Sequence, residues 1–436
     1  MPFNVQRSTM SSALPFDIIA LIIDTVGENN DTNLLKELAL VSHSFHQICS
    51  KHLFATVELH DADRKYHVAS SKNGFIKLLK SRPDVVNYIR KLTYEVSDNL
   101  QSLRLSPTHP CFDNDNHLVL SLLPSLLRTI PRLNCLTITA SQLDWTTLDS
   151  SLTSALLYLM QLPTINHIDL SFIQDFPLSS FTPSVNLHRL DISNLRRFDL
   201  HFDRLEEENS PEIIIQSEMT PKIREFQTSA SPLLTTKLLH AKRQDGRPAF
   251  NFTDLKRLST CLEDERNLRY LVQNAKSLEK IHLSVGPNQS LERLYDILSS
   301  SLRTLKLLHI SVSIYDSDPL PLAGLCEGLE AMAGHNTLEA LSFEVFVDQH
   351  ETEDYIESEV KRVEKVLLQP GWSALRQVSF KVTISCWGGG AKLYEELVQS
   401  LPVYLSRLSK LESVTFNVSV DIDKCIIQSP VYNISS

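Results

Sequence analysis

Few residues in this chain have the types and spacing that catalytic or metal chemistry needs. His52, His60 and His67 recur near Asp61 and Asp63, but no His-x-His or i, i+4 pair brings two ring nitrogens together as metal ligands. The seven cysteines are widely scattered and include no CxxC pair, which indicates neither a zinc site nor a disulfide framework. We therefore expect no metal ion and no cofactor.

Motifs for nucleotide binding or hydrolysis are also missing from the sequence. There is no GxxxxGK[ST] loop, no strand-linked GxGxxG, no GxSxG elbow and no HExxH helix. The run Gly388-Gly389-Gly390 lacks the spacing of a phosphate-binding loop and is typical of a plain connection. The sequence predicts no catalytic residues and a protein that is not an enzyme.

Composition narrows the class of protein further. The 436 residues are 42% hydrophobic and 22% charged, which is typical of a globular protein with a large core. The formal net charge of -10 argues against a general affinity for nucleic acid or anionic lipid. No stretch reaches the roughly 18 apolar residues of a membrane helix. Because the amino terminus also lacks an apolar segment of signal-peptide length, we expect a cytoplasmic or nuclear protein.

Three short amphipathic helices are predicted within the first sixty residues. The first carries Ile18 and Ile22 at helical spacing, Asp31 or Thr32 caps the second, and Ser42 begins the third. Helices of this length bury too little surface to be stable alone. We therefore expect these three helices to pack against a neighbouring structure.

Residues 12–58 resemble the F-box of fungal proteins. The matching elements are Leu14-Pro15-x-Asp17-Ile18-Ile19, then Ile22, then Leu35-x-x-Leu38-Ala39-Leu40-Val41-Ser42-x-x-Phe45. Asp17 stands where the family usually has Glu, and Phe45 where it often has Trp. The resemblance implies docking on a Skp-type adaptor, and through it on a cullin scaffold, by Leu14, Pro15, Ile18, Ile22, Leu38, Val41 and Phe45. Alternatively, the same residues only form the hydrophobic core that the three helices share.

An apolar pattern recurs through the rest of the chain: one apolar residue is followed by others three, five and often seven positions later. In Leu278-x-x-Ile281-x-Leu283-x-Val285 the last three alternate with polar residues, which is typical of a strand with one buried face. Eleven such units begin at residues 89, 133, 165, 187, 223, 255, 278, 302, 338, 375 and 411. They resemble diverged leucine-rich repeats. Helices are expected between strands, at residues 291–302, 354–368 and 393–405.

The predicted fold class is α/β: a short N-terminal three-helix F-box-like bundle followed by an irregular right-handed leucine-rich-repeat solenoid. The predicted boundaries are a flexible tail at 1–11, a docking module at 12–58, the solenoid at 59–425 and a C-terminal tail at 426–436. One strand–helix unit cannot bury its own apolar face, so only the stack would be stable.

The outward positions of the predicted strands suggest a function. Nearly all of them are polar, and a polar, mixed-charge sheet is suited to recognising another protein. The candidate target-binding residues are His167, Asp169, Arg189, Asp191, Arg257, Lys280, His282, Lys306 and Lys381. We therefore favour a substrate-receptor subunit of a cullin-RING (SCF-type) ubiquitin ligase. The alternative is a non-ligase interaction scaffold with a vestigial F-box.

Overall fold

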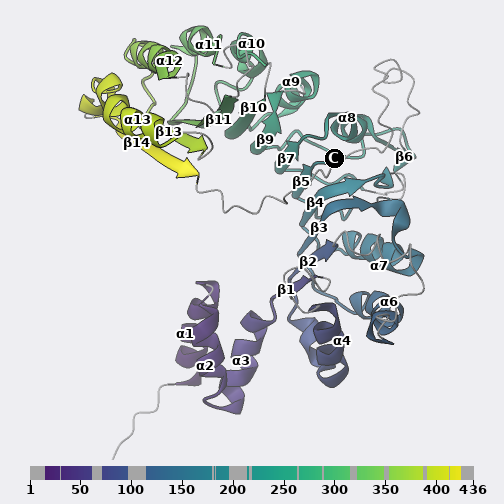
Figure 1. Cartoon of the computed structure of the whole chain (residues 1–436). Coiled ribbons are helices and arrows are strands. Elements are labelled where there is room, and N and C mark those ends of the chain that lie inside the picture. Colours follow the sequence, from purple (N-terminus) through teal and green to yellow (C-terminus); the bar gives the residue numbers. More distant parts are fainter. Residues whose placement is uncertain are drawn as a thin grey trace, which may run out of the picture. The chain divides into compact units, whose positions relative to one another are not determined.

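The computed structural model of the chain divides into two compact units (Figure 1). Unit 1 comprises Met1–Leu143 and Thr147–Ile165, and unit 2 comprises Asp144–Thr146 and Asn166–Ser436. The structure describes residues 15–29, 31–60, 71–96, 114–178, 181, 183–195, 214–215, 219–262, 265–286, 289–314, 322–347, 353–385, 390–411 and 413–423.

Helices and strands alternate along most of the chain. The α-helices are α1 (Phe16–Glu28), α2 (Thr32–Ala39), α3 (His43–Leu53), α4 (Ser71–Ser81), α6 (Asn114–Leu127), α7 (Ser150–Met160), α8 (Pro232–His240), α9 (Glu265–Asn274), α10 (Leu294–Leu298), α11 (Leu325–Met332), α12 (Glu353–Leu367) and α13 (Gly390–Tyr404). The strands are β1 (Thr56–Leu59), β2 (Lys91–Val96), β3 (Cys135–Asp144), β4 (His167–Gln174), β5 (Arg189–Ser193), β6 (Ile214–Ile215), β7 (Glu225–Ser229), β8 (Lys242–Arg243), β9 (Arg257–Cys261), β10 (Lys280–Val285), β11 (Leu307–Ile314), β12 (Ala340–Val347), β13 (Gln377–Ser385) and β14 (Thr415–Asp423).

Unit 1 begins with three helices around a small apolar core. The Asp31 carboxylate accepts a hydrogen bond from Leu34 N–H at 3.0 Å and so caps α2. The Ser42 hydroxyl does the same for Phe45 N–H at 3.3 Å and caps α3. Of the two predicted caps for the second helix, Asp31 is therefore the one used. The centre of the core is formed by Ile23, Leu35, Ile48 and Cys49.

A glycine lets α1 and α3 pack closely. A Cβ atom at Gly27 would lie 2.2 Å from His52 Nδ1, inside any van der Waals contact. Because Gly27 has none, the His52 ring lies against α1 and its Nε2 forms a hydrogen bond with Asp24 Oδ1 at 2.7 Å. Helix α1 continues to Glu28, so Gly27 serves packing and does not end the helix.

The strands form one sheet in the order β1-β2-β3-β4-β5-β7-β9-β10-β11-β12-β13-β14, while β6 and β8 pair separately. Neighbouring strands are parallel, as in β10 with β11 and β13 with β14. Parallel neighbours need a crossover connection, and helices supply many of them. In unit 2, α8–α13 lie along one side of the strands (Figure 1).

Main-chain hydrogen bonds fix the start of each strand. The Glu279 carbonyl before β10 accepts the N–H groups of Lys306 and Leu307, at 2.8 and 3.0 Å. The Lys306 carbonyl in turn accepts those of Glu339 and Ala340, at 2.8 and 2.9 Å. Each strand therefore begins where its predecessor begins, which keeps the outward side chains of successive strands in rows.

Two of the predicted strand units have the wrong register. In β11 the buried side chain is Leu308 and not Leu307, so the residue that leads into the strand is Leu305 and not Leu302. In β4 Phe172 has φ +58 and is 44% exposed, and Ile173 enters the core in its place. A residue in the left-handed region turns the strand locally and exchanges the inward and outward sides.

The predicted fold class, a three-helix bundle followed by a leucine-rich-repeat solenoid, is wrong. The described chain is an α/β protein whose 12-stranded sheet begins at Thr56, with only Phe54 and Ala55 between it and α3. The Ala55 carbonyl accepts the N–H groups of Arg90 and Lys91, at 2.8 and 2.9 Å. The end of α3 is thus tied to the start of the sheet, and α1–α3 belong to the same compact unit as β1 and β2. They do not form a separate helical-bundle fold.

Candidate functional site

The outward side chains of β4, β5, β7 and β9–β14, the strands of the main sheet in unit 2, form a surface that we call the strand face. In β10, Ile281, Leu283 and Val285 are at most 2% exposed, whereas Lys280, His282 and Ser284 alternate with them on the other side. Among the described residues of unit 2, the helices lie along the opposite side of the strands (Figure 1). The strand face is therefore a part of the sheet that the described helices of unit 2 leave uncovered and that can meet another molecule.

A chain of charged groups crosses the first strands of unit 2. His167 Nε2 lies 2.9 Å from Asp191 Oδ2, and the Arg189 guanidinium reaches the same oxygen at 2.8 Å. Arg189 also lies 3.7 Å from Glu225, which lies 3.2 Å from Arg257. Four strands are thereby connected at side-chain level.

The electrostatics of this series of charged groups depend on Asp191, which is 7% exposed. Burial opposes its ionisation, but hydrogen bonds from His167 and Arg189 outweigh burial, so the pKa of the Asp191 carboxyl lies below its usual value. Burial raises the pKa of nearby Asp169 despite a hydrogen bond from Ser171. Asp191 is thus held as an anion between the His167 ring and the Arg189 guanidinium, and these contacts order the surface.

Two histidines meet in the middle of the strand face. The rings of His282 and His309 are edge to face with centroids 4.2 Å apart. Burial, reinforced by the neighbouring ring, lowers the pKa of His282 to about 4, and burial also lowers the pKa of His309. His309 Nδ1 lies 2.9 Å from Ser342 Oγ, and Glu344 beyond it pairs with Lys381 at 2.9 Å.

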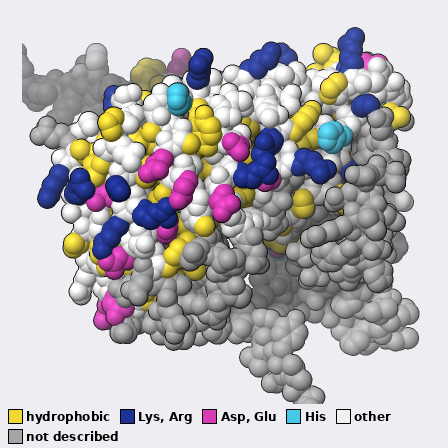
Figure 2. Space-filling view, turned by 90° about the horizontal axis from the view of Figure 1, so that it is seen from above, with side chains coloured by type: hydrophobic (Ala, Val, Ile, Leu, Met, Phe, Trp, Pro, Cys, Tyr) yellow, Lys and Arg dark blue, Asp and Glu magenta, His cyan; other side chains and the backbone are white. Residues whose placement is uncertain are grey.

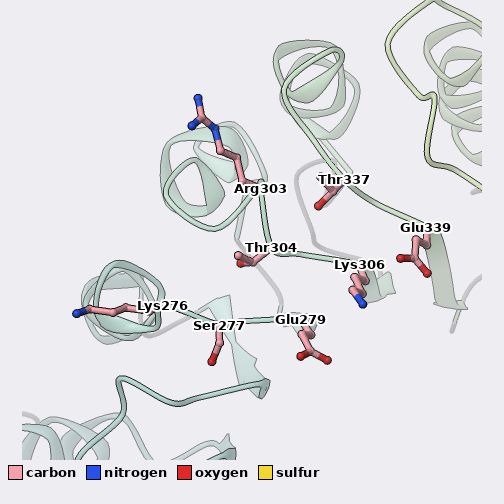
Figure 3. Close-up of a pocket in the computed structure, with 8 residues that line it drawn as sticks. All are labelled: Lys276, Ser277, Glu279, Arg303, Thr304, Lys306, Thr337 and Glu339. Atoms are coloured by element: carbon pink, nitrogen blue, oxygen red, sulfur yellow. The ribbon is translucent and has the colours of Figure 1, made fainter.

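Two open cavities lie along these strands. One of about 300 Å³ is lined by side chains of the strand face, among them Arg189, Glu225, Arg257, Lys280 and His282. The other, of about 400 Å³, lies at the strand starts (Figure 3). There Glu279, Lys306 and Glu339 follow one another at the starts of β10, β11 and β12, and Lys276 and Arg303 lie on the side of the helices (Figure 3).

The side of the molecule drawn in Figure 2, seen from above Figure 1, carries charges of both signs. On the described part of the face drawn in Figure 2, Lys and Arg side chains are interspersed with Asp and Glu, and hydrophobic side chains lie between them.

The predicted target-binding residues form two groups. His167, Asp169, Arg189, Asp191, Arg257, Lys280 and His282 follow one another on β4, β5, β9 and β10. Lys306 lies at the strand starts, in the second cavity, and Lys381 lies on β13. Sequence reasoning missed three partners: Glu225, His309 and Glu344. Glu225 and Glu344 occupy outward positions of their strands, and His309 was hidden by the register error in β11.

The predicted adaptor-binding residues also differ in environment. Pro15, Ile18, Ile22 and Val41 are exposed, whereas Leu38 and Phe45 pack partly against the core of α1–α3. Leu14 lies outside the described residues. We call the following residues the exposed apolar set, with exposed fractions of 53, 44, 67, 50, 38, 87 and 64%: Phe16, Ile18, Leu21, Ile22, Leu34, Leu40 and Val41.

Two tryptophans lie in the core, and several residues of the sequence motifs lie outside the described residues. Trp145 and Trp372 are 4 and 8% exposed and belong to the core, and Trp387, like His67 and Gly388-Gly389, lies outside the described residues. Within the described ranges, no group of three or more His, Cys, Asp and Glu side chains is arranged to hold a metal ion. The helices of those ranges include none long and apolar enough to cross a membrane. No family model and no curated protein matches this chain.

Proposed function

We propose that the chain is a non-enzymatic recognition subunit, the substrate receptor of a cullin-RING ubiquitin ligase. Helices α1–α3 bind a Skp-type adaptor, and the strand face binds the target protein. The observation that carries the adaptor half is the exposed apolar set on helices that already have a closed core.

The exposed apolar set is more than a small helical segment needs for its own stability. On α1, Ile19, Ile23 and Val26 face the core, so Ile18, Leu21 and Ile22 add a second apolar side at i, i+3 and i+4 spacing. Leu40 and Val41 add two apolar side chains between α2 and α3. Fully burying a Leu or Ile side chain contributes about 1.5–3 kcal/mol. Such side chains left in water indicate a binding partner for this segment.

The target half of the proposal rests on the strand face. Its ordered charge chain from His167 to Arg257 and the cavity lined by Arg189, Arg257 and Lys280 give fixed positions for polar contacts. The mechanism is positioning: holding the target on the strand face and the adaptor on α1–α3 raises the effective concentration of the target at a separate transfer enzyme.

The adaptor half is tested by co-purification with a recombinant Skp-type adaptor. Ile18→Glu combined with Ile22→Glu places two charges where apolar contact is proposed, and we expect the affinity to fall at least about 100-fold. Met219→Glu, at a 60% exposed apolar residue of unit 2, is the matched control and should bind normally. Failure of the wild-type chain to bind any Skp-type adaptor would refute the ligase assignment and leave the interaction scaffold.

The target half is tested separately by proximity labelling in cells. Arg257→Glu with Lys280→Glu reverses two charges beside one cavity. Proteins labelled by the wild-type chain and lost in this variant, with adaptor binding retained, are the expected targets. An unchanged set of labelled proteins would contradict recognition through the strand face.

A further inference from the structure

Strand β14 is a long sheet edge that stands open in the described part of the chain. It runs for nine residues, Thr415–Asp423, and among the described residues it pairs only with β13. We propose that β14 is a dimerisation edge on which the β14 strand of a second copy of this chain adds in antiparallel orientation.

The open main-chain groups of β14 can be assigned. Thr415 N–H donates to the Arg376 carbonyl at 2.7 Å, so the odd-numbered residues point their N–H and C=O groups toward β13. By the alternation of a parallel strand, the even-numbered residues point theirs outward. The N–H and C=O groups of Phe416, Val418, Val420 and Ile422 therefore form the free edge. Long free edges of this kind pair readily with another strand.

The side chains of the same residues are also incompletely covered. Phe416, Val418, Val420 and Ile422 are only partly buried, whereas their partners on β13 are at most 3% exposed: Val378, Phe380, Val382 and Ile384. On the adjoining helix α13, Val398 and Val403 are 41 and 66% exposed. A further strand in the sheet would cover the apolar side of β14 as β14 covers that of β13.

The sequence of β14 is complementary to itself about a two-fold axis at Ser419. In that register Phe416 opposes Ile422 of the second copy, and Val418 opposes Val420. On the other face Asp421 opposes Asn417, so no like charges meet there. Shifting the axis to Asp421 would place two carboxylates opposite each other. The axis at Ser419 also pairs all nine residues, which a shifted axis cannot do.

Features that usually protect an edge are weak here. The strand contains no Pro, Gly or Lys, and its only charges are the two aspartates near its end. Asp421 lies 3.7 Å from Lys381 on β13, which compensates its charge. A two-fold interface with matching apolar pairs is the commonest way for such a surface to close.

The register predicts a specific cross-link. With outward main-chain groups on even residues, the two Ser419 residues form a non-hydrogen-bonded antiparallel pair, with Cα atoms about 4.5 Å apart. That distance lies within the range of a disulfide, about 4.4–6.8 Å. The two Asn417 residues would lie four positions apart along the strands, roughly 13 Å, which is too far.

The test uses the full-length chain with Ser419→Cys, and with Asn417→Cys as the matched control on the same face of the same strand. After mild oxidation, a non-reducing gel should show a covalent dimer for Ser419→Cys, with at least ten times less for Asn417→Cys and the wild-type chain. A disulfide between the introduced thiol and Cys425 of the same chain would instead indicate that the chain's own C-terminal segment covers the edge, and would overturn the proposal.

Sedimentation of the unmodified protein provides the second measurement. We expect a dimer at about 50 µM and at least a tenfold weaker association for Val418→Lys, whose charge would be buried against Val420 of the second copy. A wild-type chain that sediments as a monomer at this concentration overturns the proposal. So does a Val418→Lys variant that remains folded by circular dichroism and associates as tightly as the wild type.

Discussion

The stability of unit 2 should fall as the pH falls below about 6.5, and His282 should account for part of the loss. Protonation would place a cation among His309, Ser259 and Glu344, in a position where Nε2 is buried and has no hydrogen-bond partner among the described residues. Glu344 favours the cation but is already paired with Lys381. Burial and the second ring outweigh it and hold the pKa of His282 at about 4.

The direction and the size of the pH effect on the free energy of unfolding follow from this pKa. A histidine whose folded pKa is depressed binds protons more readily when unfolded, so its contribution is fully present above about pH 6.5 and is lost as the pH falls toward 4. A shift from 6.5 to about 4 corresponds to an upper limit of about 3 kcal/mol. The ring is partly accessible to solvent, which screens the charge and reduces the expected effect to about 1–2 kcal/mol.

The assay is urea unfolding at pH 7 and pH 5, followed by fluorescence, for the wild-type chain and His282→Phe. The phenyl ring keeps the contact with His309 and cannot be protonated, so we expect this variant to lose about 1–2 kcal/mol less than the wild type between the two pH values. His335→Phe, at an exposed position, controls for a general effect of losing a histidine. Identical pH dependence in wild type and His282→Phe would refute the reasoning.

Two further predictions concern single contacts. Asp191→Asn should lower the free energy of unfolding by about 2–3 kcal/mol at pH 7, because it leaves His167 and Arg189 beside a neutral amide. Since the pKa of Asp191 is depressed, this loss should shrink as the pH falls below about 4, and a pH-independent loss would contradict an ionic role. Gly27→Ala should destabilise α1 by about 1–2 kcal/mol, measured by hydrogen exchange, because the added Cβ would displace His52. In a His52→Ala background the same change should stabilise α1 by up to about 1 kcal/mol. An effect of the same sign in both backgrounds would show that the contact between Gly27 and His52 does not matter.

The alternation of apolar and polar residues predicts much of the sheet, because a strand with one buried face leaves a period of two in the sequence. It locates the buried side of β10 and the outward positions of Arg189, Arg257 and Lys280 correctly. It fails in β11 because Leu302, Leu305 and Leu308 follow at equal spacing, and each pair fits the approach to a strand equally well. Only packing decides that Leu308 points inward and His309 outward.

Cross-strand partners are harder to predict than outward positions. Glu225 is visible in the sequence as a polar residue on a strand, but its pairing with both Arg189 and Arg257 depends on which strands are neighbours. The pattern also cannot show that β6 lies outside the main sheet, so that β5 pairs directly with β7. The charge chain is therefore a property of strand order, which no single segment encodes.

The apolar residues of α1 explain why the same helical spacing supports two opposite interpretations, a hydrophobic core and a binding surface. Ile18, Ile19, Ile22 and Ile23 fill one continuous arc of about 140° on the helix at 3.6 residues per turn, so spacing alone cannot tell a core side from a binding side. The contacts separate them: Ile19 and Ile23 face α2 and α3, and Ile18 and Ile22 face solvent. If α1 had only to form a core with α2 and α3, polar residues would be tolerated at Ile18 and Ile22. Their apolar character therefore favours a partner at this surface, and the charge-introducing variant at Ile18 and Ile22 tests that surface without removing a side chain from the core.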